Sequence, residues 1–130
     1  MLNKKFLMAM LAGVLLAAPL HAQTPADEYA ALSAQVKELA TRHADLQTAG
    51  QAEAALQETG AAQSRLQAWY AQAERACHAA FFVNSCLGDI KLQRRQQQTV
   101  LQKITLEAKA LQRRLHIEQL DRALQQKQSE

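Results

Sequence analysis

Apolar side chains recur with a helical period along most of the chain. In the first half they follow steps of mostly three and four residues from Tyr29 to Leu46, a spacing that places them on one face of a helix. In the second half a more regular three-four alternation runs from Leu87 to Leu115 and continues to Leu124 with a change of phase. These spacings predict a first helix over about 25–80 and a second helix over about 86–126, joined by a tip at about 81–85.

The two helical segments predict an all-α fold, a long antiparallel two-helix coiled-coil hairpin. If residues 77 and 86 face each other across the tip, Leu39 lies level with Leu124, and Leu46 lies level with Ile117. Residues 23–86 carry a net charge of −3 and residues 87–130 a net charge of +4, and these opposite charges favour antiparallel pairing of the two arms. The expected seam consists of Leu39, Leu46, Leu56, Leu66, Leu101, Ile104, Leu111 and Leu115.

Two glycines interrupt the pattern of the first helix. Gly50 and Gly60 each cost about 1 kcal/mol relative to alanine inside a helix, so a kink near either residue, or a break near Gly50 that gives three helices, is an alternative. Neither glycine is accompanied by proline or by a turn cluster, and one continuous helix is therefore the expectation. Thr24 is expected to cap its start, with Pro25 at the first helical position and Asp27 completing the cap.

Residues 1–22 have the pattern of a secretory signal peptide. Lys4 and Lys5 precede an uncharged apolar run from Phe6 to Ala18, and cleavage is expected after Ala22. The run is shorter than the ~20 residues that a bilayer-spanning helix needs, although a membrane anchor and a buried helix are the alternatives. The expected domain is thus residues 23–130, and the expected location is the periplasm.

Composition and charge narrow the classes of function. Removing Lys4 and Lys5 lowers the net charge from +3 to +1, which argues against the concentrated basic surface that nucleic-acid binding requires. The mature segment is rich in Ala, Gln and Leu, and aromatic residues make up 5% of the chain. This composition suits long helices better than a compact enzyme core, so we expect no catalysis and no cofactor.

Cys77 and Cys86 are the chain's two cysteines. In an exported protein we expect them to form a disulfide that closes the tip of the hairpin. The alternatives are an intermolecular bridge, a thiol-redox function with Cys86 activated near a helix start, and a metal site that includes His78. The chain has no Cys-x-x-Cys motif, and adjacent Cys-His is not a usual ligand spacing, so no metal ligand is assigned.

Phe81, Phe82 and Val83 form the densest apolar cluster after the signal peptide, and they fall at the tip. One interpretation is that one or two of these side chains close the end of the hairpin core. The other is that a surplus aromatic side chain is exposed and contacts a partner or a membrane surface. The second helix is expected to begin just after them, near Asn84 or Ser85, since either residue can cap it.

Trp69 and Tyr70 lie level with Arg94 and Arg95 in the same hairpin alignment. They can stack on the guanidinium groups, or they can occupy the seam. The second interpretation is preferred because aromatic residues at helical spacing usually belong to a core.

The segment around the cysteines resembles a family of small exported, helix-rich proteins of Gram-negative bacteria. The shared element is Cys-x3-Phe-x-Val-Asn-x-Cys-Leu, which corresponds here to Cys77, Phe81, Val83, Asn84, Cys86 and Leu87. The resemblance covers about half of the mature chain. It implies a periplasmic location and a helical architecture, and it carries over no activity and no catalytic residue.

The sequence therefore favours a non-enzymatic interaction or scaffold protein of the cell envelope. Its partner is expected to be another envelope protein, with a homodimer as a further alternative. Membrane association is left open but is not indicated by the sequence. Two other classes stay open. One is a small periplasmic chaperone of the holdase type, and the other is a thiol-redox or metal-binding protein.

Overall fold

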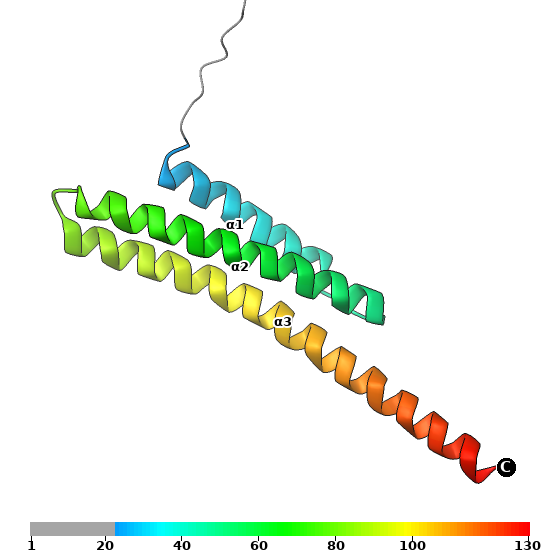
Figure 1. Cartoon of the computed structure of the whole chain (residues 1–130). Coiled ribbons are helices and arrows are strands. Elements are labelled where there is room, and N and C mark those ends of the chain that lie inside the picture. The colour runs from blue at the N-terminus through cyan, green and yellow to red at the C-terminus, as the bar shows by residue number, and fades with distance from the viewer. Residues whose placement is uncertain (1–22) are drawn as a thin grey trace, which may run out of the picture.

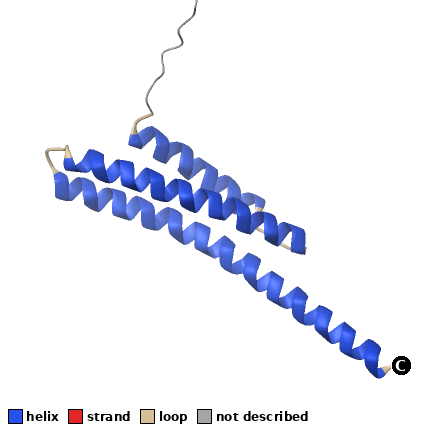
Figure 2. Cartoon of the chain, viewed as in Figure 1, coloured by secondary structure: helices blue, strands red, loops and turns tan. Residues whose placement is uncertain are grey.

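The computed structural model describes residues 23–130, and these form three α-helices without a strand. Helix α1 spans Pro25–Arg42, α2 spans Ala49–His78 and α3 spans Val83–Gln128. Helices α1 and α3 run in one direction and α2 runs in the other, and α3 continues well past the end of α2 (Figure 1, Figure 2). The expected signal peptide and its cleavage site lie outside the described residues.

The first arm is two helices, so the prediction of one continuous helix over about 25–80 is wrong. The break falls between Arg42 and Ala49, where Thr48 starts α2 with a capping box. The Thr48 hydroxyl accepts a hydrogen bond from the Gln51 backbone N–H at 3.2 Å, and the Gln51 side chain accepts one from the Thr48 backbone N–H at 3.1 Å. These reciprocal bonds satisfy backbone donors at the new helix start and stabilise the break.

The glycines are not the cause of the break. Gly50 and Gly60 both lie inside α2, and neither has a positive φ. The start of α1 agrees with the sequence prediction. Thr24 caps the helix, Asp27 completes the capping box and Pro25 occupies the first turn.

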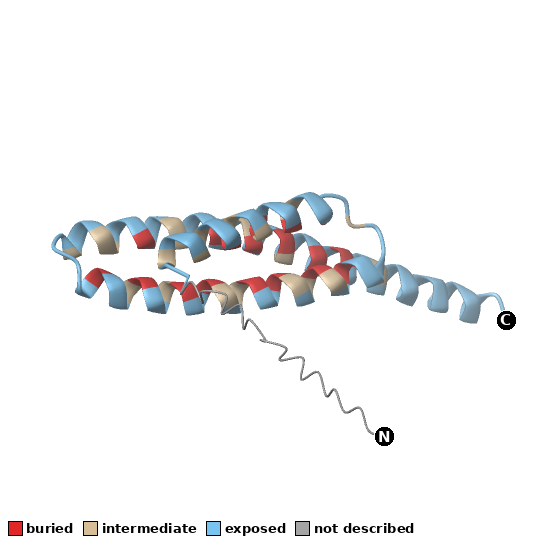
Figure 3. Ribbon diagram, turned by 90° about the horizontal axis from the view of Figure 1, so that it is seen from above, coloured by how far each residue is buried: buried red, intermediate tan, exposed pale blue. Residues whose placement is uncertain are grey.

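The core lies where the three helices meet, and α2 contributes mainly small side chains to it. Figure 3 shows buried residues on the facing sides of the helices. Among the expected seam residues, five are buried and three, namely Leu46, Leu56 and Leu115, are half-buried. The fully or almost fully buried apolar residues are Leu32, Val36 and Leu39 of α1, Ala52, Ala55, Ala62, Leu66, Trp69, Ala73 and Cys77 of α2, and Ile90, Leu101, Ile104, Ala108 and Leu111 of α3.

The alignment of α2 with α3 agrees with the register drawn from the cysteines. The Arg94 guanidinium lies over the Tyr70 ring, 4.0 Å from its centroid, and the Thr105 hydroxyl lies 3.3 Å from that of Thr59. Tyr70 therefore stacks on arginine, whereas its neighbour Trp69 is buried in the core.

The pairing expected for the far end of the hairpin is wrong. Leu39 is buried in the three-helix core, and Leu124, its expected neighbour, is 57% exposed. Leu46 lines a notch beside Leu111, and Ile117 is also exposed. The reason is that α1 folds back along α2 and α3 instead of extending beside the C-terminal part of α3.

Buried polar groups connect α1 to the other two helices. The Trp69 indole N–H donates a hydrogen bond to the Pro25 carbonyl at 2.8 Å, and the Gln97 amide donates one to the Tyr29 hydroxyl at 3.0 Å. The Tyr29 and Trp69 rings lie against each other with centroids 4.9 Å apart. Within residues 23–130 every buried side-chain nitrogen and oxygen has a hydrogen-bond partner, which favours a single arrangement of the three helices.

Ion pairs reinforce the contact between α1 and α2. The Arg65 Nε lies 2.7 Å from the Glu28 carboxylate, and the hydrogen bond from Arg65 lowers the pKa of Glu28. At the other end of α1, Glu58 accepts hydrogen bonds from His43 and Arg42. The bond from His43 is the larger cause and the charge of Arg42 adds to it, so the pKa of Glu58 is also lowered.

We predict that the Thr48→Ala substitution destabilises the protein by about 1 kcal/mol, because it removes the hydroxyl that caps α2. Chemical unfolding followed by circular dichroism measures the change. Thr99→Ala is the matched control, since Thr99 lies in the middle of α3 and its exposed hydroxyl bonds only to the Arg95 carbonyl of its own helix. Equal stabilities of the two variants would mean that the cap does not hold the break.

We also predict a loss of stability in acid. Because the folded pKa values of Glu28 and Glu58 lie below their unfolded values, the stability that these groups contribute is present above the unfolded pKa and is lost as pH falls through the folded pKa. Glu28→Gln and Glu58→Gln should each reduce the loss of unfolding free energy between neutral pH and pH ~3, by less than about 1 kcal/mol because both pairs are partly exposed. Chemical unfolding at the two pH values measures this loss.

The control for the acid prediction is Glu53→Gln, which changes an exposed carboxylate of α2. With Glu53→Gln, the unfolding free energy should fall between neutral pH and the acid pH by as much as it does in the wild type. If Glu28→Gln and Glu58→Gln also lose as much stability in acid as the wild type, the prediction is contradicted.

Candidate interaction surfaces

The tip of the hairpin is closed by a disulfide between Cys77 and Cys86, whose Cα atoms are 5.4 Å apart. Cys77 is completely buried in the last turn of α2, and Cys86 is half-buried in the first turn of α3. An intermolecular bridge was the alternative, and the structure shows the intramolecular one. Both sulfur atoms are therefore covalently occupied, and neither is a thiolate that can bind metal or act as a nucleophile.

Helix α3 begins without a side-chain cap. Phe82 occupies the N-cap position, and no side-chain hydrogen bond caps the helix there, so the expectation that Asn84 or Ser85 caps it is wrong. The Cys86 backbone N–H donates to the Phe82 carbonyl at 3.0 Å and the Ala80 N–H donates to the Cys77 carbonyl at 3.0 Å. The disulfide spans the same turn and links the end of α2 to the first turn of α3, so it holds the start of α3 in place although no side chain caps it.

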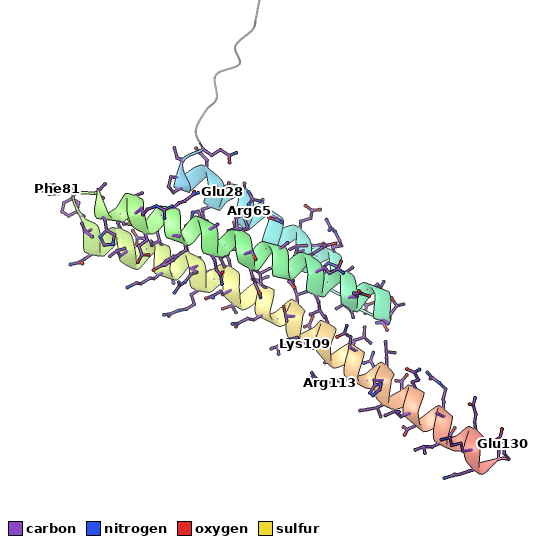
Figure 4. The ribbon with its side chains drawn as sticks, in the orientation of Figure 1. Glu28, Arg65, Phe81, Lys109, Arg113 and Glu130 are labelled. Atoms are coloured by element: carbon purple, nitrogen blue, oxygen red, sulfur yellow. A yellow bond between two sulfur atoms is a disulfide. The ribbon has the colours of Figure 1, made fainter. Side chains whose placement is uncertain are left out.

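The two phenylalanines at the tip face solvent. Phe81 is 92% exposed and Phe82 is 72% exposed, whereas Val83 is half-buried. The two rings contact each other edge to face, with centroids 4.9 Å apart and an interplanar angle of 85°. Figure 4 shows Phe81 at the very end of the hairpin, beyond both helices. Of the three side chains that were candidates to close the end of the core, the two phenylalanine rings do not do so, and only Val83 is half-buried.

A second apolar surface lies on α3, which extends alone past the bundle (Figure 3). From His116 to the C-terminus every residue is exposed. The exposed side of α3 carries five large apolar side chains that are each at least half exposed, and these are Leu92, Leu106, Ile117, Leu120 and Leu124. The sequence pattern suggested that the last three continue the core seam, but the change of phase after Leu115 carries them to another side of the helix.

The closely spaced polar side chains of the bundle bond to one another and hold the helices together. Glu58 bonds to both Arg42 and His43 at the end of α1, and Gln97 bonds to Tyr29 in the core. Within the described part of the chain, no group of three or more His, Cys, Asp or Glu side chains is arranged to hold a metal ion.

Comparisons with protein families, with characterised proteins and with solved structures gave no match to this chain. The helices of residues 23–130 include none with the length and apolar character needed to cross a membrane. The tip and the exposed face of α3 are thus identified by their geometry alone.

We predict that the Cys86→Ser substitution lowers the thermal midpoint and leaves the helical circular dichroism signal in place. In the chain-entropy model a bridge across a sequence separation of 9 contributes roughly 2.5–3 kcal/mol, whereas the three-helix core does not depend on it for its contacts. Cys86 is the better site for the change because it is only half-buried, so its replacement leaves little cavity. Wild-type protein that is kept reduced should behave like the variant, and an unchanged midpoint in both would contradict a stabilising role for the bridge.

Proposed function

We propose that this chain is an exported, non-enzymatic interaction protein of the cell envelope, and that it binds its partner through the aromatic tip. The observation that carries the proposal is the exposure of Phe81 and Phe82 on a turn that is fixed by a disulfide. Large exposed aromatic groups cost solubility unless they serve a contact, and aromatic side chains are enriched among the residues that dominate binding energy.

The geometry of the tip favours a protein partner with a concave apolar site. Phe81 lies at the narrow end of the helical hairpin (Figure 4) and the Phe82 ring contacts it, so the aromatic surface is convex. The disulfide and the helices on both sides hold the turn in one conformation, which reduces the entropy that is lost on binding. Export by the expected signal peptide would place the tip in the oxidising compartment where its bridge is stable.

The body of the protein supports a scaffold role. Its polar groups hold the helices together, as the Arg65–Glu28 and Gln97–Tyr29 contacts illustrate. The bundle therefore supplies a rigid mount that is extended in one direction (Figure 1). A holdase chaperone would also use exposed apolar surface, but it needs broad coverage of unfolded clients, and the aromatic surface at this tip consists of two side chains.

We predict that a photo-crosslinker placed at position 81 in living cells captures a discrete envelope protein. Binding of the purified partner should then weaken by roughly 30-fold or more in the Phe81→Ala/Phe82→Ala variant, because truncated hot-spot residues typically cost about 2 kcal/mol or more. Leu92→Ala is the control, since Leu92 is a large exposed apolar residue of α3 outside the tip, and it should bind as the wild type does.

Three results would contradict the proposal. One is equal affinity of the double variant and the wild type for the captured partner. Another is protection of many unfolded clients from aggregation by the wild type and not by the double variant, which would indicate a chaperone. The third is binding to lipid vesicles that depends on Phe81 and Phe82, which would indicate a membrane surface as the target.

A further inference from the structure

The exposed face of α3 carries a second heptad pattern that is separate from the core seam. Its positions follow one another in steps of four and three residues, and the large apolar members are at least 50% exposed. Each position comes two residues after a position of the core seam, so at 100° per residue the two patterns lie on nearly opposite sides of α3. The second pattern consists of Leu106, Ala110, Arg113, Ile117, Leu120 and Leu124.

The large apolar residues of this face, which we name the outer face of α3, are exposed within the described chain. At its edge, Ala110 and Arg114 line a notch together with loop residues 44–46. Helices α1 and α2 contact the opposite side, where Leu101, Ile104 and Leu111 are buried. After Leu115 that core side becomes polar, with Glu118 and Arg122 at the next positions of its pattern. The apolar character of the helix thus changes sides where α3 leaves the bundle.

We propose that the outer face of α3 pairs in antiparallel orientation with the same face of a second copy of the chain, with Ile117 opposite Leu120 of that copy. The two-fold arrangement makes each contact twice. Ile117 and Leu120 of both chains then form a central apolar cluster, and Leu124 lies over the aliphatic stem of Arg113 of the other copy. This inference rests on the proposed function as an interaction protein and assigns a partner to its second surface.

The charges beside the outer face select the antiparallel orientation. In a parallel pair Arg113 would face its own counterpart within the seam, as would Lys127, and Lys109 would lie beside Arg114 of the other helix. These are like-charge contacts, which are destabilising in coiled coils. In the antiparallel pair, Arg114 lies beside Asp121 of the second copy.

The same charges fix the register. In the proposed alignment the opposite-charge contact between Arg114 and Asp121 of the second copy is formed twice, once on each side of the two-fold axis. A shift by one heptad in one direction places Arg114 opposite Arg114, and a shift in the other places Asp121 opposite Asp121. Figure 4 labels Lys109 and Arg113 on this stretch of α3 and Glu130 just beyond the end of the helix at Gln128.

The shape of the protein is compatible with this pairing. Helices α1 and α2 lie on the other side of α3, and the bundle ends before Ile117 and Leu120, since every residue from His116 onward is exposed. The two bundles are therefore carried at opposite ends of the paired helices. The overlap is only about three heptads long, and such a short interface belongs to the weak, concentration-dependent class. Two aromatic tips would then point away from each other at the ends of the dimer.

Sedimentation equilibrium of the full mature protein up to millimolar concentration tests the inference. We expect a monomer–dimer equilibrium that Leu120→Glu weakens by at least tenfold, because the substitution places a charge at both symmetric sites of the central cluster. Leu92→Glu is the matched control, since Leu92 is exposed on the same helix but outside the overlap, and it should dimerise as the wild type does. A wild-type chain that stays monomeric, or a dimer that Leu120→Glu leaves intact, overturns the inference.

Charge reversal tests the orientation. Arg114→Asp and Asp121→Arg should each weaken the dimer by bringing like charges together, and the double variant should restore it. In a parallel pair Arg114→Asp would instead face Lys109 and strengthen the dimer, so that result overturns the antiparallel arrangement. Unchanged helical circular dichroism shows that each variant is folded, and binding through Phe81 is measured separately, so failure of self-association does not bear on the proposed function of the tip.

Discussion

The narrow, alanine-rich face of α2 determines how the other helices are arranged. Ala52, Ala55, Ala62 and Ala73 supply much of its buried surface, and two helices meeting over such small side chains bury too little apolar area to be stable alone. Small side chains also allow close approach. The third helix, α1, therefore folds back and adds larger residues such as Leu32 to the core.

This arrangement leaves both ends of the molecule less covered than its middle, and the two candidate surfaces lie at those ends. At one end α2 and α3 continue past α1 and are joined by the Cys77–Cys86 bridge, which holds the exposed phenylalanines. At the other end α3 continues alone and carries its outer face. The bundle in the middle fixes the direction of both, because Trp69 and Gln97 bond to α1 across its interior.

The sequence was sufficient to predict the helical class, the start at Thr24, the disulfide and the register of α2 against α3, because each of these depends on local patterns or on one cross-link. The preferred continuous first helix was wrong, and the alternative of a break near Gly50 that gives three helices is what the structure has, between Arg42 and Ala49. The Thr48-x-x-Gln51 capping box was the available signal. The exposure of Phe81 and the apolar outer face of α3 could not be predicted in this way. They depend on which other side chains occupy the interior once the three helices have packed together.

The folded-back position of α1 is the central claim, and contact between Tyr29 and Trp69 tests it most directly. Nuclear Overhauser effects between the two aromatic rings, measured on wild-type residues 23–130, report proximity without any substitution. The bundle predicts strong effects, because the ring centroids are 4.9 Å apart. A continuous first helix would separate the same residues by about 60 Å at about 1.5 Å per residue, and the absence of these effects in the folded protein would contradict the account.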